Sequence, residues 1–421
     1  MVSRCGTRRV RPAAVGRPRV RRGEPMKRSV RVLHVLDAQR RPGAALNALD
    51  VAARLDAARF SVGVLVCGRG REEVARQGWG GLRMLPAGSE ADCGPWGLRR
   101  LERMLRIERP DVLHARGREC GWVLVAARRA GVPVVLHSVD AWDDVELRWP
   151  AGVRARLAHR LYGHANVVTA ASDALRHAVL ARTRIAQERT LTLRPGVDVT
   201  WFAAAHPVAE VRRALGVAPG AFVCGADARG GPPLEVLRAF ARVRTVNPTA
   251  VLVLRVPPGV HDELEQLAAA HGCLGAVHAS DGTVDDRDHL AALDVAVVAG
   301  TSPTAVRDAL EASAAGTAVI AQEGRGMGEF VEDGRTGLLV SDLRAESLGD
   351  ALLRLSSTRL VRERMARAAR AHVAARFSIE ACVARHDDLY SGLLAQARGP
   401  ADAASRAASP AAPSSPAPFA R

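Results

Sequence analysis

The chain of 421 residues is too long for one small domain and fits two domains of ordinary size with tails. Its 48% apolar and 25% charged residues exclude wholesale disorder, and no apolar run is long enough to span a membrane. The seven cysteines include no Cys-x-x-Cys pair, which argues against a disulfide framework or a zinc cluster and favours a reducing, cytoplasmic setting.

The net charge of +16 is unevenly distributed along the chain. Residues 1–25 contain eight arginines and a single acid, Glu24. This leader lacks the apolar core of a signal peptide, and its prolines oppose the helix of a transit peptide. We expect either a disordered basic arm or a translation start at Met26 instead of Met1. Only 4% of residues are aromatic and none form a stacking motif, so nucleic-acid binding ranks low.

Past the leader, short apolar strands alternate with amphipathic helices, and the alternation restarts near residues 195–198. This pattern predicts an α/β protein with two Rossmann-like domains facing each other across a cleft. In chain order we predict strands at 31–36, 60–66, 111–114, 132–137, 166–170, 222–225, 250–255, 294–298 and 318–321, and helices at 44–55, 98–107, 234–243, 262–271, 306–315 and 346–395. The predicted divisions are a disordered leader (1–28), an N-terminal domain (29–200), a C-terminal domain (201–375), a C-terminal helix (376–397) and a disordered tail (398–421).

Ligands of open parallel sheets bind at the carboxyl ends of the strands, so the residues that follow each strand are the candidates. Gly43 lies in the turn after the first strand, and His114 and His137 each end a predicted strand, with Asp140 three residues later. A histidine there can orient a substrate hydroxyl or place a backbone carbonyl near a developing cation. A plain turn at Gly43 and loop-packed histidines are the alternatives. The loop after residue 66 lacks the third glycine of a dinucleotide fingerprint, which argues against a nicotinamide cofactor.

In the second half, Glu311 begins the helical turn EASAAGT at 311–317, which follows the strand at 294–298 and the short loop at 300–304. A carboxylate there could accept both hydroxyls of a ribose, and the amides of 300–304, up to Thr304, could hold a phosphate. Glu329 follows the next strand, and its alternative reading is a carboxylate placed at the start of a helix.

The order of the segments from Val32 to Leu393 resembles the family-4 glycosyltransferases of the GT-B fold. The motifs that carry the resemblance are RPDVLHA at 109–115, GVPVVLHSVD at 131–140, ANVVTAAS at 165–172, PGVD at 195–198, EASAAGTAVI at 311–320 and EFVEDGRTGLLV at 329–340. The resemblance implies that the C-terminal domain binds a nucleotide-sugar donor, that the N-terminal domain holds the acceptor, and that transfer retains the anomeric configuration without a metal.

The donor site departs from the family pattern. Ala226 and Gly231 stand where the family has the arginine and lysine that neutralise the diphosphate, and Pro303 replaces the first acid of a Glu-x7-Glu pair. Charge-assisted contacts contribute about 1.5 to 3 kcal/mol each, so losing two could slow transfer by about 10²- to 10⁴-fold. Arg229 and Arg325 lie on neighbouring loops and are candidates to replace the missing charge.

We therefore predict a retaining glycosyltransferase that moves a sugar from a nucleotide-sugar donor to a hydroxyl acceptor, a glycan or a lipid. The alternative is a catalytically impaired nucleotide-binding or scaffolding relative. No metal and no cofactor besides the donor substrate are expected. Basic helix faces at 98–109 and 153–160 allow a peripheral contact with anionic membrane, although solvated helices packed on a sheet explain them more simply. The predicted site residues are His137 as catalytic residue, Glu311, Arg229, Arg325, Thr304 and Glu329 for the donor, and Gly43, His114 and Asp140 for the acceptor.

Overall fold

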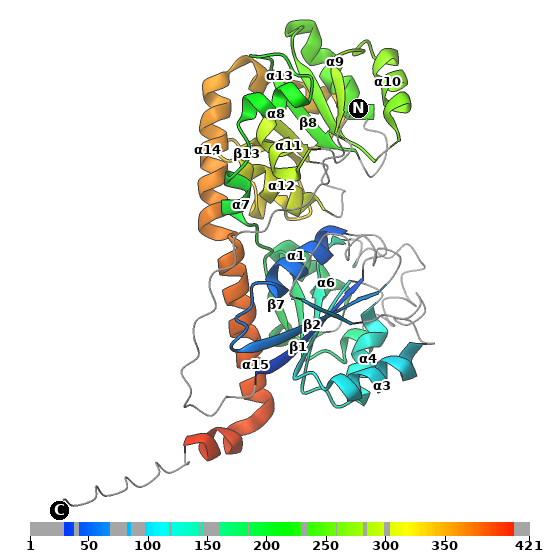
Figure 1. Cartoon of the computed structure of the whole chain (residues 1–421), viewed down its shortest axis with the longest axis vertical. Helices are drawn as coiled ribbons and strands as arrows, with labels where there is room; N and C mark the ends of the chain where they lie inside the picture. Colours follow the sequence, from blue (N-terminus) through cyan, green and yellow to red (C-terminus); the bar gives the residue numbers. More distant parts are fainter. Residues whose placement is uncertain are drawn as a thin grey trace, which may run out of the picture.

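The computed structural model describes residues 29–37, 42–67, 82–85, 97–117, 120–142, 145, 160–183, 185–228, 234–257, 259–280, 284–298 and 304–407. Within them the chain forms two parallel sheets, one in each half, flanked by helices (Figure 1). The predicted α/β class and the two Rossmann-like domains are confirmed. The predicted leader lies outside the described residues, as does most of the predicted basic helix at 153–160. No helix of the described part is both long and apolar enough to cross a bilayer.

The N-terminal sheet has the strand order β3-β2-β1-β4-β5-β6-β7, with every pair parallel. Its central strands β4, β5 and β6 are buried on both faces, which is why their sequences are continuously apolar apart from a few embedded polar residues. The strands are β1 (Val30–Asp37), β2 (Phe60–Cys67), β3 (Arg83–Leu85), β4 (Val112–Arg116), β5 (Val134–Val139), β6 (Val167–Ala170) and β7 (Thr190–Thr192). The helices are α1 (Pro42–Ala52), α3 (Leu98–Glu108), α4 (Gly121–Arg129), α6 (Asp173–Arg182) and the short η5 (Gln187–Arg189).

The C-terminal sheet has the order β10-β9-β8-β11-β12-β13 and is also parallel throughout. Its strands are β8 (Val223–Asp227), β9 (Val251–Arg255), β10 (Val277–Ser280), β11 (Val295–Val298), β12 (Ala318–Gln322) and β13 (Gly337–Val340). Its helical segments are α7 (Val199–Ala203), α8 (Val208–Ala214), α9 (Leu234–Val246), α10 (His261–Ala270), α11 (Asp286–Ala292), α12 (Ala305–Ala315), η6 (Met327–Glu329), α13 (Ala345–Ser357) and α14 (Arg359–Arg376). Helix α12 ends where Gly316 adopts a left-handed φ of 82°, a conformation that glycine allows without strain.

The last helix, α15 (Ile379–Ala407), leaves the C-terminal domain and packs against the N-terminal sheet (Figure 1). Its Ile379, Tyr390 and Leu394 share a buried cluster with Val134 and Leu136 of β5. This helix extends past the predicted end at residue 397 into the segment that we expected to be a disordered tail, so that boundary is wrong. Apolar and small residues continue through the segment, and composition alone did not mark the end of the helix.

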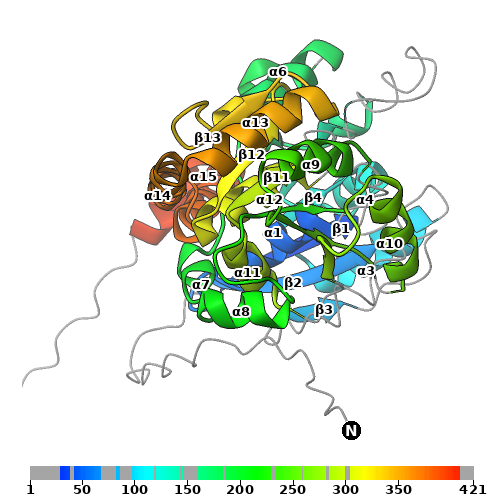
Figure 2. The same ribbon diagram turned by 90° about the horizontal axis from the view of Figure 1, so that it is seen from above.

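The segment that joins the domains passes close to the start of α15. A Cβ atom on Gly196 would lie 2.6 Å from Cys382 Cβ and 2.9 Å from the Ser378 carbonyl oxygen, closer than real contacts allow. Only glycine therefore fits at this position of the predicted PGVD linker. Figure 2, which views the molecule from above, places α12 of the C-terminal domain over α1 of the N-terminal domain.

Candidate functional site between the two domains

The candidate site lies where the carboxyl ends of the C-terminal strands and the start of α12 meet helix α1 of the other domain. Strands β8 and β9 end at Asp227 and Arg255, and α12 begins directly after Thr304. An ion pair between Arg307 of α12 and Asp50 of α1 shows that the two domains touch here.

Glu311, the predicted ribose acid, is 7% exposed and is held by an arginine one helical turn earlier. Arg307 Nε lies 2.6 Å from Glu311 Oε1, and both terminal nitrogens of Arg307 donate to Asp50 Oδ2 at 3.2 Å. Burial raises the pKa of Glu311, and the charge of Arg307 opposes that shift. Burial likewise opposes the charge of Arg307, but Glu311 and Asp50 outweigh it, so the arginine pKa is raised.

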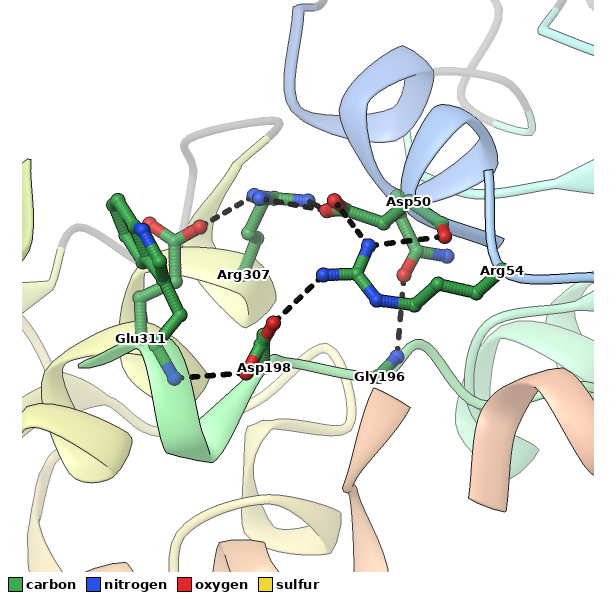
Figure 3. A network of polar contacts seen from close by, with 8 residues as sticks. Asp50, Arg54, Gly196, Asp198, Arg307 and Glu311 are labelled. Atoms are coloured by element: carbon green, nitrogen blue, oxygen red, sulfur yellow. Dashed lines mark hydrogen bonds and ion pairs between the residues drawn. The ribbon is translucent and has the colours of Figure 1, made fainter. Parts of the chain in front are cut away.

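The contacts continue on the N-terminal side of Asp50 (Figure 3). Arg54 contacts Asp50 at 3.2 Å and Asp198 of the linker at 2.6 Å. Asp198 in turn accepts a hydrogen bond from the Trp201 amide at the start of α7. We call Glu311, Arg307, Asp50, Arg54 and Asp198 the Arg307 chain. It joins α12, α1 and the linker through alternating charges.

Thr304 and Asp308 form a second feature of this site. The Thr304 side chain makes no capping hydrogen bond to α12 and instead donates to Asp308 Oδ2 at 2.6 Å. Burial raises the pKa of Asp308 to about 7, with Glu311 and Asp227 adding to the shift while the Thr304 hydrogen bond opposes it. Asp308 is partly accessible to solvent. Because its pKa is about 7, the carboxyl group is partly protonated at neutral pH and can both donate and accept hydrogen bonds.

Arg255 supplies a positive charge at the end of β9. It is 8% exposed, and its terminal nitrogen Nη2 lies 3.3 Å from Asp286 Oδ1 at the start of α11. Its charge lowers the pKa values of Asp308 and Glu311, which places it within electrostatic reach of both acids. Arg229, which we predicted as a replacement cation, lies outside the described residues. Ala226 is buried in the apolar core of the C-terminal domain.

His137, the predicted catalytic residue, is fully buried in β5 rather than at its end. Its ring centroid lies 4.4 Å from that of Tyr162, and neither ring nitrogen has a hydrogen-bond partner in the described structure. Burial, and then the charge of Arg116, lowers the pKa of His137 to about 3. At neutral pH the imidazole is therefore uncharged.

The expectation that His114 ends a strand is wrong. His114 is the third residue of β4 and fully buried. Its Nδ1 lies 2.7 Å from the Tyr390 hydroxyl of α15, and its Nε2 lies 2.6 Å from Ser138 Oγ. The sheet faces explain this, because adjacent strands place His114 beside Leu136 and under α15, whereas His137 lies beside Ala115 on the opposite face.

Asp140 follows β5 and forms an ion pair with Arg116 at 3.2 Å. Arg116 is itself 4% exposed and also contacts His386 Nε2 of α15 at 2.8 Å. Gly43 is the second residue of α1, so it lies in the first turn of the helix rather than in the turn before it. Asp140 is thus paired with an arginine of the protein, and its role in acceptor binding stays a prediction.

Glu329 and Arg325 both reach the other domain. The two carboxylate oxygens of Glu329 accept hydrogen bonds at 2.9 Å from the amides of Asp173 and Ala174, at the start of α6. Glu329 therefore lies at the start of a helix, as in the alternative interpretation of its sequence position, but that helix is α6 of the opposite domain. The Arg325 carbonyl accepts a hydrogen bond from Trp142 Nε1 at 2.7 Å. Donor binding by either residue stays a prediction.

Two protein-family models match the two halves of the chain. The model of "Glycosyltransferase Family 4" matches residues 43–201, and that of "Glycosyl transferases group 1" matches residues 234–358. Together they span more than half of the chain. This chain belongs to glycosyltransferase family 4.

Two curated relatives of this family-4 chain are named D-inositol 3-phosphate glycosyltransferase. The protein of Actinosynnema mirum is 30% identical over 281 residues, 61% of this chain and 66% of the relative. That of Geodermatophilus obscurus is 31% identical over 326 residues, 70% of this chain and 69% of the relative. The first alignment thus spans slightly less than two thirds of the relative's length.

The crystal structure of Anabaena HepE in complex with UDP and glucose shares the fold of this family-4 chain. Its TM-score is 0.71 at 21% identity, and the match covers 86% of this chain and all of the neighbour. This likeness confirms the GT-B arrangement of two Rossmann-like domains.

Sequence reasoning missed Asp50, Arg255, Arg307 and Asp308 at the candidate site. The signal for Arg307 and Asp308 was available, because they lie four and three residues before Glu311 and so share its side of α12. No such signal existed for Asp50, which belongs to the other domain. Among the described residues no cluster of three or more histidine, cysteine or acidic side chains could hold a metal ion.

Proposed function

We propose that this protein is a retaining glycosyltransferase that transfers a sugar from a nucleotide-sugar donor to a hydroxyl acceptor. The observation that carries the proposal is the position of Glu311, a buried acid on α12 that is linked through Arg307 to the opposite domain. The names of the curated relatives and the UDP and glucose bound by the Anabaena neighbour support a nucleotide-sugar donor.

In this proposal the Glu311 carboxylate accepts hydrogen bonds from the ribose hydroxyls, and the first turn of α12 faces the diphosphate. The amides at a helix start carry partial positive charge and favour an anion. Thr304, Arg229, Arg325 and Glu329 remain the other proposed donor contacts. The contacts that Glu329 makes with α6 would have to rearrange for it to reach a donor.

The proposed transfer is a front-face displacement. The acceptor oxygen forms a bond to the anomeric carbon on the side from which the diphosphate leaves, the bond from that carbon to the phosphate oxygen breaks, and the hydroxyl proton passes to the departing diphosphate. His137 is uncharged at neutral pH, since its pKa is about 3. It is also fully buried, so the ring would have to become accessible before it could orient the substrate by hydrogen bonding, which is its proposed role. Gly43 and Asp140 are proposed to contact the acceptor.

Titration calorimetry with UDP, GDP, ADP and their sugars tests donor binding. Release of free diphosphate in the presence of hydroxyl acceptors, D-inositol 3-phosphate among them, tests transfer. We expect one nucleotide to bind and its sugar to be turned over. Absence of binding by every nucleotide would contradict the proposal.

A catalytically impaired nucleotide-binding relative is the second candidate. Ala226, Gly231 and Pro303 remove three polar contacts that the family pattern would supply, and Glu311 is already paired with an arginine. Nucleotide binding without turnover on any acceptor would favour this candidate.

A further inference from the structure

Arg307 binds two carboxylates with different parts of its guanidinium group. Its Nε contacts Glu311 of the same helix at 2.6 Å, and its two terminal nitrogens contact Asp50 of the other domain at 3.2 Å (Figure 3). The three side chains are 18%, 9% and 17% exposed, so the group is largely shielded from water.

The two halves of this contact differ in quality. Charge-assisted hydrogen bonds from nitrogen to a carboxylate oxygen are normally about 2.7 to 2.9 Å long. The contact to Glu311 is that short, whereas both contacts to Asp50 are longer and converge on one oxygen atom. The terminal nitrogens of Arg307 thus hold the more weakly bound anion of the two.

The charges around Glu311 show why this anion matters. Asp50 and Asp286 raise the pKa of Glu311, while Arg307 and Arg255 lower it. A nucleoside diphosphate would add about two more negative charges at a site where the family cations at 226 and 231 are absent. Arg307 is a described cation that already touches the proposed ribose acid and presents a pair of donors beyond it.

We propose that Arg307 is the cation that binds the donor phosphates in this chain, and that Asp50 is an internal anion which occupies the arginine until the donor displaces it. The proposal rests on the proposed function. Nε remains on Glu311 throughout, and the two terminal nitrogens exchange a carboxylate for a phosphate. Because Asp50 belongs to the opposite domain, donor binding then breaks an ion pair between the domains.

Asp50→Asn tests the internal anion. Both contacts of Asp50 with Arg307 are long, and Asp50 also has a second arginine partner, Arg54, so the competition is modest. Removing the competitor is expected to tighten UDP binding about fivefold, which corresponds to about 1 kcal/mol. Uridine, which lacks phosphates, is expected to bind unchanged. Asp387→Asn is the matched control, since Asp387 is 19% exposed and pairs with Arg59, a residue far from it in the chain. It should change neither affinity.

Arg307→Gln tests the cation. We expect the ratio of UDP to uridine affinity to fall about tenfold or more, because a charge-assisted contact to phosphate is lost. Arg307→Lys keeps the charge without the paired donors, so its ratio of UDP to uridine affinity should lie between those of the unaltered protein and Arg307→Gln. Arg212→Gln is the control, because Arg212 is 17% exposed and pairs with Asp294 of the same domain. Thermal unfolding of each variant shows whether it is folded.

The outcomes separate this proposal from the one on which it rests. Absence of binding by the unaltered protein for UDP, GDP and ADP overturns the proposed function. Binding of UDP by the unaltered protein, with Asp50→Asn no tighter, overturns the internal anion. An equal loss of UDP and uridine affinity in folded Arg307→Gln shows that Arg307 only supports Glu311, which also overturns the proposal.

Discussion

Two groups of polar side chains, one buried under α15 and one at the boundary between the domains, differ in charge. The first, which we call the histidine cluster, consists of His34, His114, Arg116, His386 and Tyr390 between the N-terminal sheet and α15. The second is the Arg307 chain at the boundary between the domains. The histidine cluster is almost entirely neutral, whereas every member of the Arg307 chain is an acid or an arginine.

Hydrogen bonds and ring contacts hold the histidine cluster together. Besides the bonds of His114 to Tyr390 and Ser138, the ring centroids of His34 and His114 lie 5.5 Å apart. Burial, and then the positive charge of Arg116, lowers the pKa values of His34, His114 and His386.

This contrast separates a structural role from a binding role. Neutral groups that are buried together and bonded to one another stabilise the docking of α15, and a ligand would gain little by replacing them. The ion pair between Arg307 and Asp50 is different, because an incoming anion can replace Asp50 on Arg307 while Asp50 keeps its contact with Arg54. Neither charge is then left alone. The difference predicts that variants of the first region lower stability and variants of the second change nucleotide binding.

The largest effect is expected for Tyr390→Ala. Tyr390 is fully buried, and deleting a buried aromatic side chain costs about 3 to 5 kcal/mol. Tyr390→Phe removes only the hydroxyl that bonds His114 and should cost about 1 to 3 kcal/mol. Urea unfolding measures both. If Tyr390→Ala is as stable as the unaltered protein, α15 is not docked as described.

Acid should weaken the N-terminal domain at two buried imidazoles, His386 of the histidine cluster and His137 on the opposite face of the sheet. The pKa values of His137 and His386 are lowered from 6.5 to about 3, so between those values the unfolded chain binds protons that the folded protein does not. The stability is fully present above pH 6.5 and falls as the pH decreases. At pH 5 we expect a loss of about 2 kcal/mol for each of these imidazoles.

Urea unfolding at pH 7 and pH 5 checks this pH dependence. The loss should be smaller in a folded His386→Gln variant, which lacks one of the two groups. Equal stability of the unaltered protein at the two pH values would contradict the buried, neutral state of the histidines.

Glu311→Gln probes the second region. The substitution keeps the size of the side chain but removes its negative charge. That charge binds Arg307 and, in the proposed function, accepts the hydrogen bonds of the ribose hydroxyls. We expect nucleotide affinity to fall about 10- to 100-fold, as for the loss of one charged hydrogen bond. Calorimetry with UDP measures it. Glu363→Gln, on the exposed side of α14, is the control, and an unchanged affinity in Glu311→Gln would exclude Glu311 from the donor site.

The smallest effect is expected for Glu329→Gln. Glu329 caps α6 across the domain boundary and also contacts Arg194 at 2.9 Å. Loss of a capping carboxylate costs about 1 kcal/mol, and thermal unfolding should show it. A loss of UDP affinity with unchanged stability would instead support the predicted donor contact.

Local pattern was sufficient for most of the secondary structure. The predicted strand at 250–255 and the predicted helix at 98–107 correspond closely to β9 and α3. Both follow from side-chain periodicity and from end signals, such as Pro110 after α3, where Arg109 adopts a left-handed φ of 45°. Four strands were missed, β3, β7, β10 and β13, each of which has only three or four residues and so shows little periodicity.

Sequence by itself determined the α/β class, the two domains, the family motifs and the position of Glu311, because each is encoded by the order and spacing of residues near one another in the chain. Only the tertiary structure decided that His114 faces α15, that Glu329 caps a helix of the other domain and that Asp50 meets Arg307. Those contacts join residues more than 100 positions apart, and which groups meet depends on the sheet face and on the docking of the two domains, which no local period records.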